Sequence, residues 1–200
     1  MIDESHGLSH AMDILLYAHE IYKSELILHT ELNTQELIIY VSAILHDMCD
    51  KKYMDQDDGI REINQFLMQH ASCMGLSDEE ITVVKDIMKT MSYSYVKQNG
   101  FPSMGIYQHA YHIVREADLL CAYDFDRCMI FHMNMIGNGD IEHAFNDSVT
   151  LFGNRVFKHA DDGLFLTDYA KLVWPEMQKN AMLRINQWRE ILKNNAILTV

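Results

Sequence analysis

Few residues in this chain interrupt regular secondary structure. Its 200 residues include two prolines and nine glycines, whereas a sandwich of many short strands needs frequent turns, which these residue types usually supply. Apolar residues instead recur at helical spacing along most of the chain. The pattern is clearest over 33–48, where the apolar face consists of Leu37, Tyr40, Val41, Ile44, Leu45 and Met48. We therefore predict an all-α fold.

The same periodicity divides the rest of the chain into helical segments. Further helices are predicted over 5–26, 57–76, 77–91, 141–158 and 167–192. Another is predicted to begin at about 106, to bend within 122–127 and to end before a break at 137–140. The segment 92–105 is predicted to be a loop, because Asn99-Gly100 and Pro102 interrupt any period. Pro175 either kinks the last helix or starts a new one. Since no repeat or linker is visible, we expect one domain, spanning 1–200, with about six to eight helices.

The charge of the chain limits the partners that it can have. Sixteen Lys and Arg against 29 Asp and Glu leave a formal net charge of −13, which repels nucleic-acid backbones. We expect no nucleic-acid polymer as a partner, whereas a small phosphorylated ligand is compatible with this charge. The first ten residues, MIDESHGLSH, lack the apolar stretch of a signal peptide, and no apolar run reaches membrane-spanning length. The four cysteines form no C-x-x-C pair. We expect a cytoplasmic protein without a membrane partner; a homodimer is also compatible with the sequence.

Two histidines and two aspartates occupy positions that favour a metal site. His10 lies on the first predicted helix, His46 and Asp47 lie near the end of the second, and Asp118 lies within a later one. Asp118 is flanked by Ala117 and by two leucines, so we expect it to be partly buried and to need a partner such as a metal. Two imidazoles with two carboxylates suit one divalent transition metal, namely Mn, Fe, Co, Ni or Zn, with Mg as a further candidate.

The order and the surroundings of these residues resemble a known family. His10 stands in SHAMDIL, His46-Asp47 in AILHD, and Asp118 in READLL. This H…HD…D series resembles the signature of the HD superfamily of metal-dependent phosphohydrolases, and the run HDMCDKKY is most similar to its small stand-alone members. The resemblance implies a single HD-type helical bundle, with the motifs within 5–127 and C-terminal helices over 140–195 packing on it.

The resemblance also implies a reaction and roles for further residues. His10, His46, Asp47 and Asp118 would bind the metal, and a metal-bound hydroxide would attack the phosphorus of a nucleotide or another small phosphorylated metabolite. Asp50 lies one helical turn after His46 and would assist the attacking water. Four basic residues are candidates for binding the substrate phosphate: Lys51, Lys52, Arg115 and Arg127. The two lysines are also explained by the electrostatics of a helix end alone.

Other interpretations remain open from the sequence. A di-iron oxygenase of the same fold would need extra ligands, for which His70 with His109 or His112 are candidates. Met91 stands where many relatives carry a histidine, which argues against a second metal. A non-catalytic, metal-containing nucleotide-binding module is a further alternative. Arg155 either points toward the site or forms a surface salt bridge.

Overall fold

The protein is an all-α helical bundle. The computed structural model describes residues 7–48, 55–135 and 140–198, and within these ranges it contains nine α-helices, three 3₁₀ helices and no strand. The α-helices are α1 (Leu8–Glu25), α2 (Glu36–Leu45), α3 (Gln56–Met74), α4 (Asp78–Thr90), α5 (Tyr93–Asn99), α6 (Gln108–Cys121), α7 (Phe125–Met135), α8 (Ile141–Asn154) and α9 (Asp168–Leu198). The 3₁₀ helices are η2 (Thr30–Thr34), η3 (Gly105–Tyr107) and η4 (Val156–Lys158). The predicted fold class is confirmed.

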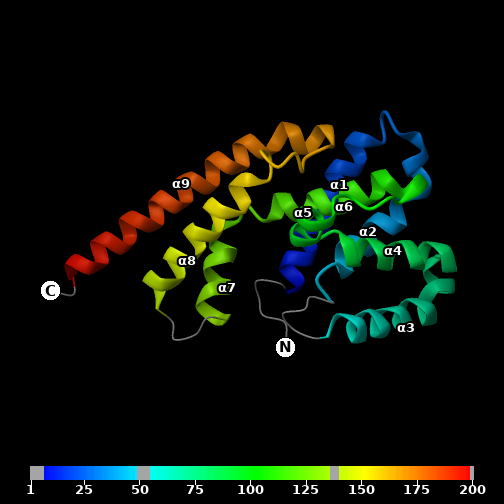
Figure 1. The fold of residues 1–200 in the computed structure, drawn as a ribbon, viewed down its shortest axis with the longest axis horizontal. Helices are drawn as coiled ribbons and strands as arrows, with labels where there is room; N and C mark the ends of the chain where they lie inside the picture. The colour runs from blue at the N-terminus through cyan, green and yellow to red at the C-terminus, as the bar shows by residue number, and fades with distance from the viewer. Residues whose placement is uncertain (1–6, 49–54, 136–139, 199–200) are drawn as a thin grey trace.

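The helices form two connected parts (Figure 1). In the first part α6 packs against α1 and α2, and α2 also packs against α4, which carries α3 on its outer side. In the second part α7 and α8 lie side by side, and α9 runs along both parts and contacts α1, α6, α7 and α8. α6 is the central helix, since 110–117 and 119–121 are all buried. Asp118 interrupts that buried run, so it marks where the core opens.

Local signals explain several helix boundaries. A capping box begins α4: Ser77 Oγ accepts from the backbone N–H of Glu80, and the Glu80 carboxylate accepts from the backbone N–H of Ser77. Gly75 follows α3 with φ of 78°, a left-handed conformation that glycine adopts without strain. These polar and glycine signals set the ends of helices whose apolar faces are already fixed by periodicity.

The predicted loop over 92–105 contains a helix, so that prediction is wrong in part. Ser92 caps α5, because its Oγ accepts from the backbone N–H of Tyr95. Asn99-Gly100 ends α5, and Gly100 has φ of 75° and ψ of −174°. The turn dipeptide therefore marks the end of a short helix instead of a continuous loop.

Three other boundaries differ from the sequence-based expectation. The helix predicted from 106 begins at Gln108 after a 3₁₀ turn, and the bend within 122–127 is a full break between α6 and α7. At this break the Asp124 carboxylate caps α7 by accepting from the backbone N–H of Arg127. The segment 141–158 is helical to Asn154 and ends in η4. The splitting of 106–135 and the presence of α5 raise the helix number above the predicted six to eight.

α9 continues through Pro175 without a break. The proline removes one backbone hydrogen bond, but both sides of it are held by contacts to other elements. Before it, Trp174 stacks on Phe165 with ring centroids 6.4 Å apart. After it, Arg184 donates two hydrogen bonds to Asp126 of α7, at 2.8 and 2.9 Å. These contacts fix the course of α9 across the bundle.

The start of α9 is anchored by two buried glutamates. Glu25 at the end of α1 accepts from the backbone N–H of Asp168 at 2.8 Å. Glu116 of α6 is fully buried and accepts from the backbone N–H groups of Leu166 and Thr167, both at 3.0 Å. The segment that leads into α9 is therefore tied to both α1 and α6.

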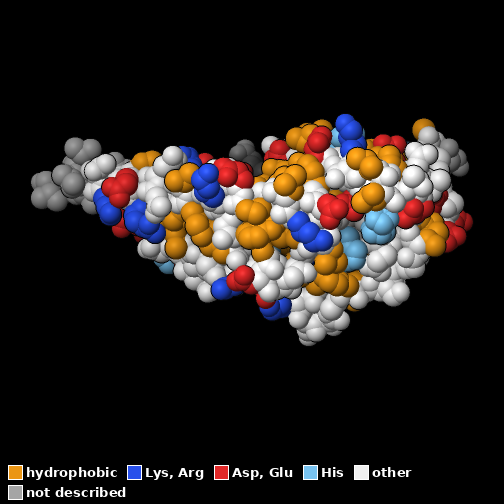
Figure 2. Space-filling model, turned by 90° about the horizontal axis from the view of Figure 1, so that it is seen from above, with side chains coloured by type: hydrophobic (Ala, Val, Ile, Leu, Met, Phe, Trp, Pro, Cys, Tyr) orange, Lys and Arg blue, Asp and Glu red, His pale blue; other side chains and the backbone are white. Residues whose placement is uncertain are grey.

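Hydrophobic side chains are scattered over the face that α9 crosses, among acidic and basic ones (Figure 2). Large hydrophobic side chains exposed on α9 include Leu172, Met182, Leu183 and Ile191. Among the described helices, none combines the length and the apolar character that crossing a bilayer requires.

Candidate metal centre and pocket

The structure brings the four predicted metal ligands together from three helices. His10 comes from the first turn of α1, His46 and Asp47 directly follow α2, and Asp118 lies in the last turn of α6. The Nε2 atoms of His10 and His46 lie 3.3 and 3.1 Å from the same oxygen of Asp47. His10 Nε2 also lies 4.0 Å from an oxygen of Asp118. Three parts of the sequence thus converge on one point.

The ligand atoms are close enough to share an ion. One ligand atom from each of His10, His46 and Asp118 lies within 4.8 Å of the other two. Bonds of about 2.1 Å to a central zinc-like ion set neighbouring ligand atoms about 3–4 Å apart. The cluster therefore fits a divalent transition metal after small side-chain adjustments.

The environment of His46 favours metal binding over a purely structural role. Its Nδ1 lies 2.8 Å from the backbone carbonyl of Ala43, to which it must donate. In a neutral imidazole this leaves Nε2 with a lone pair that faces the Asp47 carboxylate oxygen at 3.1 Å, a contact without hydrogen-bond geometry. A backbone carbonyl that accepts from the other ring nitrogen and so orients the histidine is typical of metal ligands. Burial opposes protonation of His46, but Asp47 and Asp118 outweigh it and raise the pKa of the imidazole.

The two aspartates differ from the histidines in their access to solvent. The side chains of His10 and His46 are 2% and 3% exposed, whereas those of Asp47 and Asp118 are 22% and 25% exposed. The imidazoles therefore form the inner side of the cluster. The carboxylates form its outer side, where a small molecule can approach.

Three of the four residues of the cluster line a cleft with two lobes. The smaller lobe has a volume of about 170 Å³ and is lined by His10, Asp47 and Asp118, with Arg127 and Arg155 among its other residues. The larger lobe has a volume of about 480 Å³. Three residues line both lobes, namely His10, Asp124 and Arg127. The lobes therefore meet beside His10 of the cluster.

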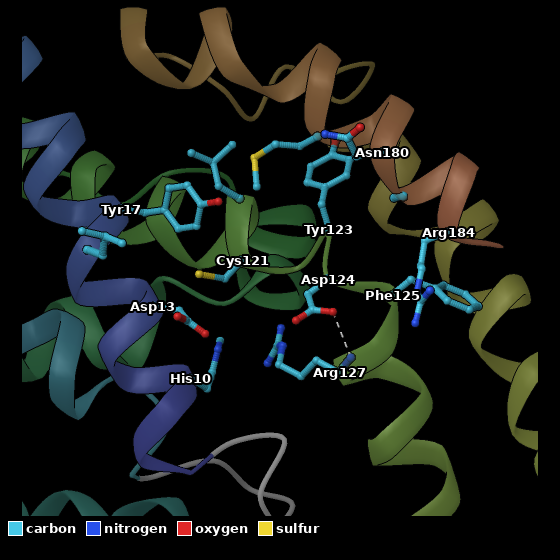
Figure 3. A pocket seen from close by; sticks show the side chains of 14 residues that line it. His10, Asp13, Tyr17, Cys121, Tyr123, Asp124, Phe125, Arg127, Asn180 and Arg184 are labelled. Atoms are coloured by element: carbon cyan, nitrogen blue, oxygen red, sulfur yellow. Dashed lines mark hydrogen bonds between the residues drawn. The ribbon is translucent and has the colours of Figure 1, made fainter. Parts of the chain in front are cut away.

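The larger lobe lies between α1, the α6–α7 break and α9 (Figure 3). α1 contributes Asp13 and Tyr17, and α9 contributes Asn180 and Arg184. In Figure 3 the side chain of Arg127 points between His10 and Asp124, into the centre of the lobe. Tyr17, Asn180 and Arg184 were not among the predicted site residues, because no local motif marks them.

Only some of the residues predicted to bind the substrate or to assist catalysis can be placed relative to the cleft. Arg127 lines both lobes. Arg115 is 1% exposed, lines neither lobe, and donates from Nη2 to Glu116 and to the carbonyl of Leu164, at 2.8 and 2.6 Å. Three predicted residues lie outside the described residues: Asp50, Lys51 and Lys52.

Arg155 lies at the cleft, in agreement with the first of the two alternatives that the sequence left open for it. It lines the smaller lobe, and its guanidinium carbon lies 4.8 Å from the ring centroid of Tyr93. Tyr93 in turn donates to Asp162 at 3.1 Å, which holds the ring in place beneath the guanidinium. Stacking on an aromatic ring leaves the edge of a guanidinium available to an anion.

The histidines considered for a second iron do not line the cleft. His109 and His112 precede Asp118 on α6 by nine and six residues, or about 13 and 9 Å along the helix axis. His112 is buried, and burial lowers its pKa to about 3. His70 is exposed on α3, where its Nδ1 lies 2.9 Å from the carbonyl of Phe66. These positions give no support to a di-iron centre built from these three residues.

The same arrangement of helices occurs in a solved structure. Neither the comparison with protein-family models nor that with curated proteins finds a match. The chain is similar to a Lactobacillus plantarum protein whose crystal structure was determined as a Northeast Structural Genomics target. The match has a TM-score of 0.67 at 17% identity and covers 95% of this chain and 89% of the other. At this identity the likeness shows a common fold.

Proposed function

We propose that this chain is a member of the HD superfamily and a metal-dependent phosphohydrolase, acting on a nucleotide or another small phosphorylated metabolite. The observation that carries the proposal is a cluster of two buried histidines and two partly exposed aspartates beside a lobe whose lining includes Arg127 and Arg155. A metal-binding cluster beside two guanidinium groups suits an anionic substrate better than a neutral one.

The residues of the cluster would hold one divalent transition metal. Such an ion supplies Lewis-acid polarisation of a phosphoryl oxygen and lowers the pKa of a bound water. His46 is already oriented for this role by Ala43, and Asp47 and Asp118 present their carboxylates toward the open side of the cluster. The chain therefore needs only small movements of side chains to bind the ion.

The two arginines would position the phosphate and offset its charge. A guanidinium binds two phosphate oxygens at once, which restricts the orientation of the phosphate. Arg155 approaches from the turn after α8 and Arg127 from the first turn of α7. Charge that develops during phosphoryl transfer would be stabilised from both sides of the lobe.

The larger lobe would take the rest of the substrate. Its volume of about 480 Å³ is in the range of small-molecule sites. Tyr17 offers an aromatic ring, whereas Asp13, Asp124 and Asn180 offer hydrogen-bonding groups for hydroxyl or amino groups. This combination suits a nucleoside or a sugar linked to the phosphate.

A phosphate-release screen tests the proposal. Nucleotides and sugar phosphates are incubated with full-length protein and with Mn, Fe, Co, Ni, Zn or Mg ions. Asp47→Ala should abolish the activity, because it removes the carboxylate that both histidines face. Arg155→Ala should raise KM at least several-fold, and the exposed His143→Ala on α8 should match the wild type. Unchanged turnover in Asp47→Ala would refute the proposed site.

Two further results would favour the alternative functions. Thermal stabilisation by nucleotides without turnover would favour a non-catalytic binding module. Two irons per chain with an oxygen-dependent reaction would favour an oxygenase and would refute the hydrolase.

A further inference from the structure

A second group of potential metal ligands lies far from the cleft. Glu25, His29 and His109 each place one ligand atom within 4.8 Å of those of the other two. Glu25 and His10 lie at opposite ends of α1, fifteen residues apart, which corresponds to about 22 Å along the helix. The two groups therefore cannot share an ion.

The geometry of the chain explains why these residues meet. The backbone N–H of His29 donates to the carbonyl of Glu25 at 2.9 Å, so the turn after α1 keeps helical spacing. Residues four apart on a helical turn project to the same side, an arrangement that allows both to bind one ion. His109 lies in the first turn of α6, which packs along α1, and Figure 1 shows the segment after α1 descending to the start of α6.

The two imidazoles are held close together. The ring centroids of His29 and His109 lie 3.8 Å apart, with an angle of 34° between the ring planes. His29 Nδ1 lies 3.4 Å from an oxygen of Glu31. That contact orients the ring as an outer-sphere carboxylate orients a metal-binding histidine.

The carboxylate of Glu25 is also held in a fixed orientation by a hydrogen bond. Its side chain is buried although it carries a carboxyl group, and Oε1 accepts from the backbone N–H of Asp168 at 2.8 Å. The hydrogen bond to Oε1 holds the carboxylate in one orientation. Because His29 and His109 are only partly buried, an ion can reach this position from solvent.

We propose that Glu25, His29 and His109 form a second site for a divalent transition metal of the zinc class. Two imidazole nitrogens and one carboxylate oxygen are a common ligand set for zinc, and water would complete the coordination. The ion would link the end of α1 to the start of α6 and, through the bond from Glu25 to Asp168, to the start of α9. The proposed role of the ion is to hold these elements together, and the site is independent of the proposed hydrolase activity.

Counting bound ions tests the site. Full-length protein is stripped with a chelator, dialysed against zinc, and analysed for zinc per chain, with cobalt absorption as a second readout. Two ions are expected in the wild type, one in Asp47→Ala, one in His109→Ala and none in the double variant. His143→Ala, which changes an exposed histidine on α8, should keep two.

Thermal stability provides a second measurement. Zinc should raise the melting temperature of Asp47→Ala but not that of Asp47→Ala/His109→Ala. His29→Gln keeps a polar side chain at a partly exposed position and should lose the same ion as His109→Ala. A His109→Ala variant that binds as many ions as the wild type would overturn this site. Loss of an ion in His109→Ala but not in Asp47→Ala would support it and would refute the metal centre in the cleft.

Discussion

Glu116→Gln tests how the segment before α9 is anchored to the core. The Glu116 carboxylate is fully buried and accepts four hydrogen bonds. Oε1 accepts from Arg115 Nη2 at 2.8 Å and from Leu166 N at 3.0 Å. Oε2 accepts from Thr167 N at 3.0 Å and from Thr167 Oγ1 at 2.7 Å. All four groups donate hydrogen bonds to Glu116, so its surroundings fit a carboxylate, which only accepts.

The expected loss of stability follows from the interactions of the carboxylate that the Gln amide cannot replace. Gln keeps one acceptor oxygen, but its NH₂ group then faces donors, and Arg115 loses its buried counter-charge. Breaking a buried ion pair by removing one partner costs about 3–5 kcal/mol. Burial raises the pKa of Glu116 above its ordinary value, against the opposing effects of Arg115 and of the donors at Leu166 and Thr167. Because all four contacts donate to the carboxylate, we nevertheless expect the charged form at pH 7.

Urea unfolding of the metal-free protein at pH 7, followed by circular dichroism, measures the effect. We expect the free energy of unfolding to fall by about 3–5 kcal/mol in Glu116→Gln. Glu176→Gln, which removes an exposed pair with Lys179, should change it by less than about 1 kcal/mol. Adding Arg115→Met to Glu116→Gln should restore part of the loss, because no buried charge then lacks a partner. A loss below about 1 kcal/mol in Glu116→Gln would refute this account.

Three further predictions concern stability. Burial, followed by the charge of Arg155, lowers the pKa of the fully buried His159 to about 4. The unfolded chain therefore takes up a proton near pH 6.5 that the folded chain does not, and stability should fall from about pH 6.5 to pH 4. His159→Phe should reduce the slope of unfolding free energy against pH by up to about 1.4 kcal/mol per unit, and an unchanged slope would contradict the assignment. Gly100→Ala should cost about 1–3 kcal/mol, because its backbone conformation is accessible almost only to glycine. Gly153→Ala, in helix α8 with space around it, should stabilise the protein by up to about 1 kcal/mol in the same urea assay.

The long helices could be predicted because their apolar faces extend over several turns. α5 was missed since its seven residues are too few for a clear period, and its main signal is the single cap at Ser92. The sequence alone also could not decide whether α9 continues through Pro175, because this depends on contacts of Trp174 and Arg184 with distant elements.

In the candidate site, too, residues within local sequence motifs could be predicted, whereas residues placed by the packing of distant helices could not. His10, His46-Asp47 and Asp118 each lie in a recognisable local motif, and the structure brings them together. Tyr17 and Asn180 reach the cleft only through the packing of α1 and α9. Their roles therefore could not be inferred before the path of α9 was known.

The chain contains two tryptophans, and both lie on α9. Trp174 stacks on Phe165 near the start of the helix, and Trp188 donates from its indole N–H to Asp126 of α7 at 2.6 Å. Asn180 and Arg184 lie between them and form one wall of the larger lobe. The intrinsic fluorescence of the protein thus comes from indoles on either side of that wall, and its emission reports how α9 is seated without any added label.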